Sequence, residues 1–141
     1  MANVIPYAFR GELLTGTHNF ASGGDSFKLA LYTASPYDTS STVYNATNEV
    51  SASGTNYTTT GNTLAGNAVA YGTAVASCDF TDSTWSSATF TAAFGAIYND
   101  SQSDKLCVVL DFSGNKTATN GTFTVTFPSP STPADAIISM A

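Results

Sequence analysis

The sequence predicts a mainly β protein, an antiparallel β-sandwich or jelly-roll-like fold that forms one domain over residues 1–141, with a short N-terminal helix. Short runs of alternating apolar and polar residues recur about 8–12 residues apart, which is the spacing of strands in sandwiches and barrels. Segments rich in Gly, Asn and Pro separate these runs. The chain length of 141 residues fits a single domain.

The helix is predicted over residues 6–16. Pro6 suits the first helical turn. Phe9 and Leu13 are spaced as on one helical face, and Gly16 is a typical C-terminal stop. So short a helix is not stable alone and must dock on other elements. We therefore treat residues 1–20 as an N-terminal arm, and we expect a chain without it to remain a folded β domain.

The predicted strands follow from apolar alternation. They cover residues 27–32, 69–75, 84–91, 94–98, 105–112, 122–127 and 137–138, with a turn at 113–121 that ends in Asn-Gly. Residues 105–112 form the longest apolar run. We therefore expect this strand at the centre of a sheet, covered on both faces.

Residues 36–66 are the least regular segment and hold few aliphatic residues. So polar a stretch is most often a long or disordered loop, but Tyr37, Tyr44 and Tyr57 lie within it, and disordered segments are poor in aromatic residues. We expect an ordered, irregular excursion, with short strands at 43–44 and 49–50, that packs on the body or on a neighbouring subunit.

Charge is scarce: charged residues make up 10% of the chain, against about 25% in an ordinary domain. The net charge is −6, and the four basic residues are scattered, so we expect no nucleic-acid partner and no membrane partner. The start of the chain lacks the features of a signal peptide, and no apolar run is long enough for a membrane helix, which predicts synthesis in a cytoplasm.

Residues with catalytic potential are few. His18 is the single histidine, and with no G-x-S-x-G motif in the chain we favour a capping or packing role for it over catalysis. Two carboxylate pairs of the kind that glycosidases need are present, Asp79 with Asp82 and Asp100 with Asp104. Aspartate also favours turns, and we prefer the interpretation that these residues form turns.

Metal and thiol chemistry is not indicated either. Residues 99–104 carry oxygen ligands but lack the Gly and terminal Glu of an EF-hand loop. Cys78 and Cys107 lie in apolar, strand-like contexts and are expected to be buried thiols, neither bridged nor bound to zinc. The sequence therefore predicts no catalytic, cofactor-binding or metal site, and a protein that is not an enzyme.

Several segments together carry a family resemblance. Ile5 to Phe20 precedes Asp25 to Thr33, and a block from Asp79 to Asp100, with Thr-Trp-Ser-Ser-Ala-Thr at 84–89, continues into residues 108–112. In this order the segments resemble a family of small structural proteins of tailed bacteriophages, cyanophages included. The resemblance covers most of the chain, rests on packing and turn residues, and carries over no catalytic residue.

The resemblance implies a virion structural protein. The favoured role is a capsid decoration (cement) protein that binds the major capsid protein on the outer capsid surface, stabilises the lattice, and is made in the host cytoplasm. The low charge and the irregular, Tyr-rich segment 36–66 lead us to expect self-association as well, with a trimer favoured. The alternative is a tail, baseplate or fibre module that contacts the host surface or its glycans. An uncharged Ser, Thr and Asn surface can be buried in contacts without burying unpaired charge, which agrees with either role.

Overall fold

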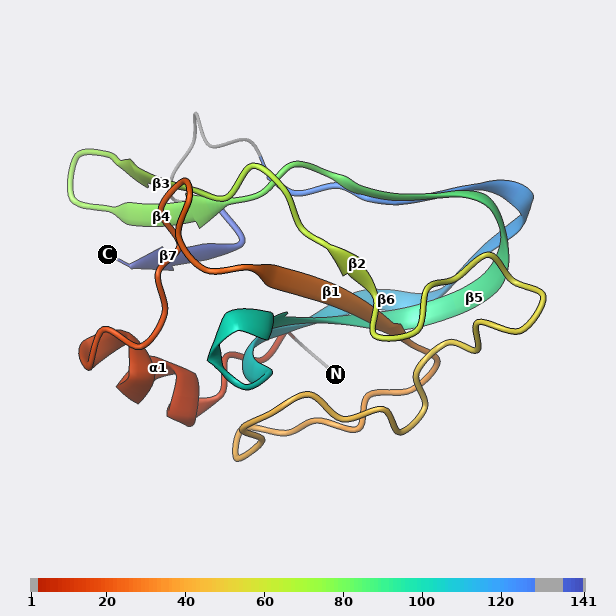
Figure 1. The fold of residues 1–141 in the computed structure, drawn as a ribbon, viewed down its shortest axis with the longest axis horizontal. Coiled ribbons are helices and arrows are strands. Elements are labelled where there is room, and N and C mark those ends of the chain that lie inside the picture. Colours follow the sequence, from red (N-terminus) through yellow and green to blue (C-terminus); the bar gives the residue numbers. More distant parts are fainter. Residues whose placement is uncertain (1–2, 129–135, 141) are drawn as a thin grey trace.

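The computed structural model describes residues 3–128 and 136–140 of the chain. The predicted fold class is confirmed, because the protein is mainly β with two antiparallel sheets and one short N-terminal helix. In chain order the elements are α1 (Tyr7–Leu14), β1 (Phe27–Tyr32), β2 (Asn62–Thr63), β3 (Ala68–Tyr71), β4 (Ala76–Asp79), β5 (Ser83–Asn99), the 3₁₀ helix η1 (Asp100–Gln102), β6 (Lys105–Val125) and β7 (Ile138–Met140) (Figure 1).

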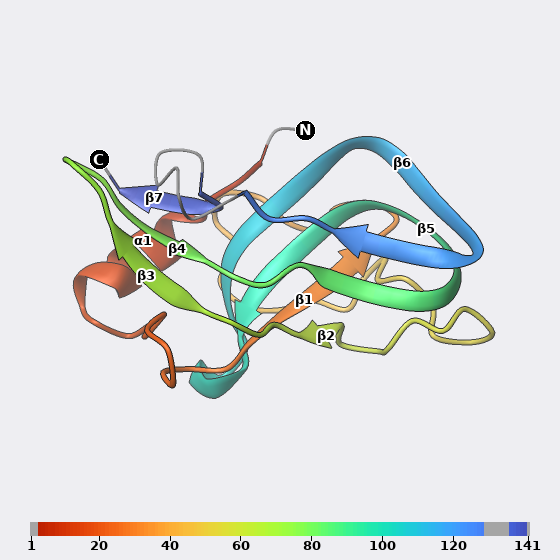
Figure 2. The same ribbon diagram turned by 90° about the horizontal axis from the view of Figure 1, so that it is seen from above.

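The two sheets are joined by one long ribbon. One sheet has the strand order β2-β1-β5-β6, and the other has the order β3-β4-β7. β5 and β6 pair antiparallel from Ser83–Val125 to Asn99–Lys105, and four register shifts interrupt the pairing. Such bulges bend strands. Figure 2 shows the ribbon curving, so that the start of β5 and the end of β6 run toward the β3-β4-β7 sheet.

The main core fills the space between these layers with aromatic side chains. Trp85 is buried, and its ring contacts those of Tyr57, Phe90 and Phe123 at centroid distances of 6.0–6.3 Å. At the other end of the core the rings of Phe20 and Phe27 stack 4.3 Å apart. Aromatic pairs of this kind add about 0.5–1.5 kcal/mol each beyond their burial.

A second, smaller core lies on the other face of the β1-β5-β6 sheet, beneath residues 36–50. Tyr37 and Tyr32 share a hydrogen bond between their hydroxyls at 2.7 Å, and the ring of Tyr44 packs 4.8 Å from that of Tyr98. Glu49 ties this segment together, because its carboxylate accepts hydrogen bonds from the hydroxyls of Tyr44 and Tyr57. Residues 36–66 are thus packed on the body of their own chain.

The predicted central position of residues 105–112 is wrong, because β6 is the last strand in the order of its sheet. Residues 106–110 are nevertheless buried, because their side chains are divided between the main core and the second core. The edge of β6 is covered by other segments. Val4 exchanges two backbone hydrogen bonds with Val109, and Thr42 accepts one from the N–H of Leu106. An apolar run indicates buried side chains, and it does not reveal whether a strand or another segment lies along the edge of the strand.

Two turn predictions also need correction. Residues 113–121 belong to β6, where the predicted Asn-Gly turn is a register shift that places Gly121 opposite Ala88. The predicted strand over 69–75 is instead a hairpin between β3 and β4, closed by a hydrogen bond from the N–H of Gly72 to the carbonyl of Val75. Alternation of apolar residues continued across this turn, so periodicity alone did not reveal it.

The N-terminal residues are part of the body. Phe9 on α1 is fully buried, Phe20 stacks on Phe27, and Val4 pairs with β6. Removing residues 1–20 would therefore take several side chains out of the main core. The expectation that the truncated chain remains a folded β domain does not fit this packing. Point substitutions on the exposed face of α1 are therefore a better test of docking than deletion of the segment.

Candidate functional site

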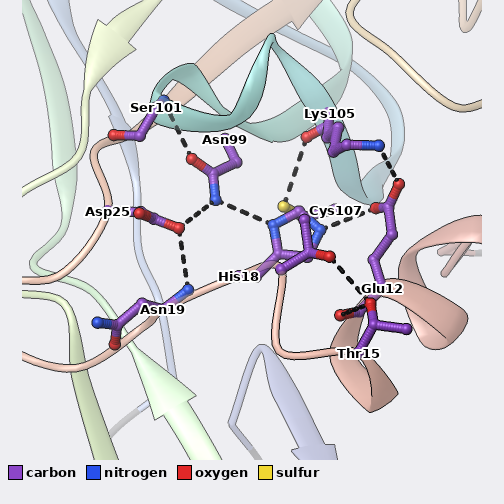
Figure 3. A network of polar contacts seen from close by, with 10 residues as sticks. Glu12, Thr15, His18, Asn19, Asp25, Asn99, Ser101, Lys105 and Cys107 are labelled. Carbon is purple, nitrogen blue, oxygen red and sulfur yellow. Dashed lines mark hydrogen bonds and ion pairs between the residues drawn. The ribbon is translucent and has the colours of Figure 1, made fainter.

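The single histidine lies in a partly buried polar cluster, which we call the His18 network: Glu12, His18, Asp25, Asn99 and Lys105 (Figure 3). Nε2 of His18 lies 2.8 Å from Oε2 of Glu12 on α1, and Nδ1 lies 2.9 Å from the side-chain nitrogen of Asn99 at the end of β5. Because the amide nitrogen of Asn99 donates, Nδ1 accepts, and the ring hydrogen on Nε2 is donated to Glu12.

Asn99 is the centre of the network and is fully buried. Its side-chain nitrogen also donates to Oδ2 of Asp25 at 2.8 Å, and its side-chain oxygen accepts from the backbone N–H of Ser101 at 3.0 Å, which caps η1. One side chain thus connects the loop after α1, the start of β1 and the turn between β5 and β6.

The two carboxylates of the network are held in their charged form. Burial raises the pKa of Glu12, but the hydrogen bonds from Lys105 and His18 and the charge of Lys105 outweigh it, so the pKa lies below its ordinary value. Burial likewise raises the pKa of Asp25, and hydrogen bonds from Asn19, Asn99 and Gln102 bring it below its ordinary value. Lys105 completes the network with an ion pair to Glu12 of 2.5 Å.

The geometry of this network is that of a structural clamp. The side chain of His18 has no exposed surface, and its ring packs 5.0 Å from Phe9 and 6.2 Å from Phe20. A general base must come within hydrogen-bond reach of a substrate proton, and this ring is enclosed while both nitrogens are bonded within the protein. The network therefore fastens α1 to the β5–β6 turn.

Two of the other sequence candidates, Asp82 and Asp100, have partners outside the His18 network. Asp82 accepts a hydrogen bond from the N–H of Phe127, and Asp100 forms an ion pair with Lys28 at 3.3 Å. Among residues 3–128 and 136–140, no group of three or more His, Cys, Asp or Glu side chains could hold a metal ion. In the sequence Asn99 is a turn residue and the first of the oxygen-bearing residues 99–104, and no local signal indicates its bonds to His18 and Asp25.

The two cysteines are buried and unbridged. Burial, helped by the charge of Asp79, raises the pKa of Cys78 to about 12. Burial also raises the pKa of Cys107 well above its ordinary value, with smaller contributions from Cys78, Glu12 and Asp25. Because the thiolate is the reactive form, both thiols are poor nucleophiles in the folded protein.

Apolar side chains are exposed at the end of the molecule that holds α1, β3, β4 and β7 (Figure 1). Leu14 is 85% exposed and Tyr71 is 83% exposed, and Val69 and Met140 are also on the surface. We call these four residues the apolar end. A groove of about 330 Å³ between α1 and β7 is lined by Leu14 and Met140, and a smaller one of about 150 Å³ is lined by Val69 and Met140.

A larger groove of about 560 Å³ follows β6 and mixes polar with aromatic groups. Phe112 and Phe123 contribute rings, Lys116 contributes a charge, and Thr117 and Thr122 contribute hydroxyls. The groove offers stacking and hydrogen bonding to a polar ligand.

Acid should weaken the His18 network. The pKa values of Glu12 and Asp25 are lower in the folded protein than in the unfolded chain. The two carboxylates therefore contribute their full stabilisation at pH values above the unfolded-state pKa values, and this stabilisation is lost as the pH falls through the folded-state pKa values. We expect the free energy of unfolding to fall between about pH 5 and pH 3, measured by urea titration at several pH values. Glu12→Gln should make this fall shallower; an equally steep fall in the variant contradicts the assignment.

Within the described part of the chain, no helix has the length and apolar character needed to cross a membrane. Comparison of the chain with protein-family models, with curated proteins and with solved structures finds no match.

Proposed function

We propose that the protein is a structural component of a tailed-bacteriophage virion, and specifically a capsid decoration protein that binds the outer capsid lattice and stabilises it. The observation that carries the proposal is the apolar end, an exposed apolar surface suited to docking on another protein. The ionisable groups of the His18 network, by contrast, are bonded within the fold. A protein that binds only the assembled shell stabilises that shell by mass action.

The charge distribution supports docking on protein. The net charge of −6 is unfavourable for contact with packaged nucleic acid, and it suits an outward-facing surface. Leu14 and Tyr7 are exposed on α1, while Phe9 and Glu12 fix the opposite side of the helix to the body. The helix α1 therefore presents exposed apolar side chains from a position that is fixed to the body of the protein, as interface anchors require. Self-association, with a trimer favoured from the sequence, is part of the same proposal.

The second candidate is a tail, baseplate or fibre module that contacts host glycans. The observation that favours it is the groove along β6, since rings and hydroxyls together suit sugars. The two candidates differ in location: fluorescent labelling of the protein on intact particles should mark the whole head for a decoration protein, whereas signal at a single vertex favours the tail module. Absence of the protein from purified particles contradicts both.

Substitution on α1 tests the docking face. Leu14→Lys should weaken binding to capsids that lack the protein at least tenfold, because a buried apolar anchor contributes about 1.4 kcal/mol or more. Thr119→Lys, which adds the same charge at an exposed position on β6, is the control and should bind like the wild type. Co-sedimentation of purified protein with capsids measures both. Equal binding by Leu14→Lys and wild type would remove the apolar end from the docking surface.

A further inference from the structure

β3 is an edge strand without the usual protection. Its one strand partner is β4, and no other backbone hydrogen bond to it is present among residues 3–128 and 136–140. Proteins protect such edges with Lys, Pro, bulges or covering segments. The stretch from Ala65 to Cys78 contains no charged residue and no proline.

The backbone groups at the free edge can be assigned. The N–H of Gly72 donates to the carbonyl of Val75 at 2.7 Å, which makes these two residues a hydrogen-bonded pair of the β3–β4 hairpin. Hydrogen-bonded pairs alternate along an antiparallel ladder, so Ala70 directs its N–H and C=O toward β4. Val69 and Tyr71 therefore direct theirs outward, at the unpaired edge.

The apolar side chains form rows across the β3-β4-β7 sheet. Val69 lies opposite Cys78, and Cys78 lies opposite Ile138, which gives one row that enters the main core. Two residues farther along the strands, Tyr71 lies opposite Ala76 and Ala76 opposite Met140. Residues two apart on a strand share a face, so the buried row and the exposed row lie on the same side of the sheet.

We infer that β3 pairs antiparallel with β3 of a second copy of this chain, about a two-fold axis at Ala70. In this register Val69 of one copy lies opposite Tyr71 of the other, and these are the residues whose backbone groups point outward. The pairing sets an aromatic residue against a β-branched one, a favourable cross-strand combination. The exposed row of each copy then continues the buried row of its partner.

The acidic groups of the two copies do not oppose this pairing, although each copy carries a net negative charge. Asp79, the nearest acidic residue by register, lies on β4 opposite Ala68. In the proposed pairing the two Asp79 residues are three strand spacings and four residues apart, about 20 Å in all from standard sheet dimensions. This exceeds the screening length of about 8 Å at physiological salt. The edge thus brings two copies together without placing their acidic groups in contact.

The first test is a matched pair of tyrosine substitutions. The inference rests on the self-association proposed above, with a dimer in place of the trimer, and not on the virion role. It is therefore tested by light scattering of purified protein without capsids. Wild type at high micromolar concentration should have twice the 14.5 kDa mass of one chain. Tyr71→Lys should be monomeric, while Tyr7→Lys, a substitution of another exposed tyrosine, should dimerise like wild type.

Circular dichroism confirms that each variant is folded, and Tyr71→Ser replaces Tyr71→Lys if the lysine variant is not. A monomeric wild type, a trimeric wild type, or association of the folded Tyr71 variant equal to that of wild type overturns the inference. Failure of capsid binding with an intact dimer would count against the virion role alone.

Cysteine cross-linking tests the register. Two Ala70 residues facing each other as a non-hydrogen-bonded pair have Cα atoms about 4.5 Å apart, within the range that a disulfide bridges. Ala70→Cys should form a covalent dimer under mild oxidation, whereas Ala68→Cys, which faces Gly72 of the partner, should cross-link at least tenfold more slowly. The wild-type protein is the control for cross-linking through the native Cys78 and Cys107, which are buried. Cross-linking of Ala68→Cys as fast as that of Ala70→Cys overturns the proposed axis.

Discussion

Replacing Asn99 with alanine is expected to lower the free energy of unfolding by about 3 kcal/mol or more. The substitution removes the partner of Nδ1 of His18 and of the N–H of Ser101 and leaves a small cavity. A buried polar group without a partner costs about 1–3 kcal/mol. Asp25 loses one hydrogen bond but keeps the one from the backbone of Asn19.

Urea denaturation followed by the fluorescence of the buried Trp85 measures this change. Asn115→Ala is the matched control, since Asn115 is exposed on β6, and it should change stability by less than about 0.5 kcal/mol. Asn99→Asp should be at least as harmful as alanine, because it places a second carboxylate against Asp25. A loss below 1 kcal/mol for Asn99→Ala would show that the network contributes little to stability.

Gly61→Ala should be comparably destabilising for a steric reason. Gly61 has a φ of +81°, and a Cβ added there would lie 2.0 Å from the carbonyl oxygen of Leu29 on β1. Relief of this overlap requires β2 to move away from β1. That movement would also disturb Thr60, whose carbonyl accepts a hydrogen bond from the hydroxyl of Tyr98. We expect a loss of about 3 kcal/mol or more, as for other disruptions of core packing.

Gly54→Ala separates the steric effect from the effect of backbone conformation. Gly54 has a similar φ of +71°, but an added Cβ would meet no atom within 4 Å. Its cost should be about 1–2 kcal/mol, which is the strain of the left-handed conformation alone. Thermal and urea unfolding of both variants give the comparison, and equal losses would contradict the close approach of Gly61 to β1.

Local patterns predicted those parts of the fold that depend on neighbouring residues. Alternation located β1 and the paired halves of the long ribbon, and Pro6 with Phe9 located α1. The aromatic residues of 36–66 indicated order. The edge position of β6 was missed, because apolar residues report burial without reporting which segments cover them.

The His18 network was missed for a related reason. His18 and Asn99 are 81 residues apart in the chain, and neither belongs to a motif with characteristic spacing. Asn99 looked like an ordinary turn residue, since asparagine is common in turns. Its role depends on three segments that meet only in the folded protein. The sequence favoured a capping or packing role for His18, and the structure encloses its ring beside Phe9 and Phe20.

The pairing of Val4 with Val109 has a consequence for the order of folding. Val4 leaves the ribosome early but has no partner until the strand that contains Val109 has been made. The β5–β6 ribbon closes through a short turn and can form from local contacts, whereas docking of the N-terminus closes a loop of more than a hundred residues. Distant contacts of this kind slow folding. Docking of the N-terminal segment is therefore expected as a late step, and the edge of β6 remains open to other chains until it occurs.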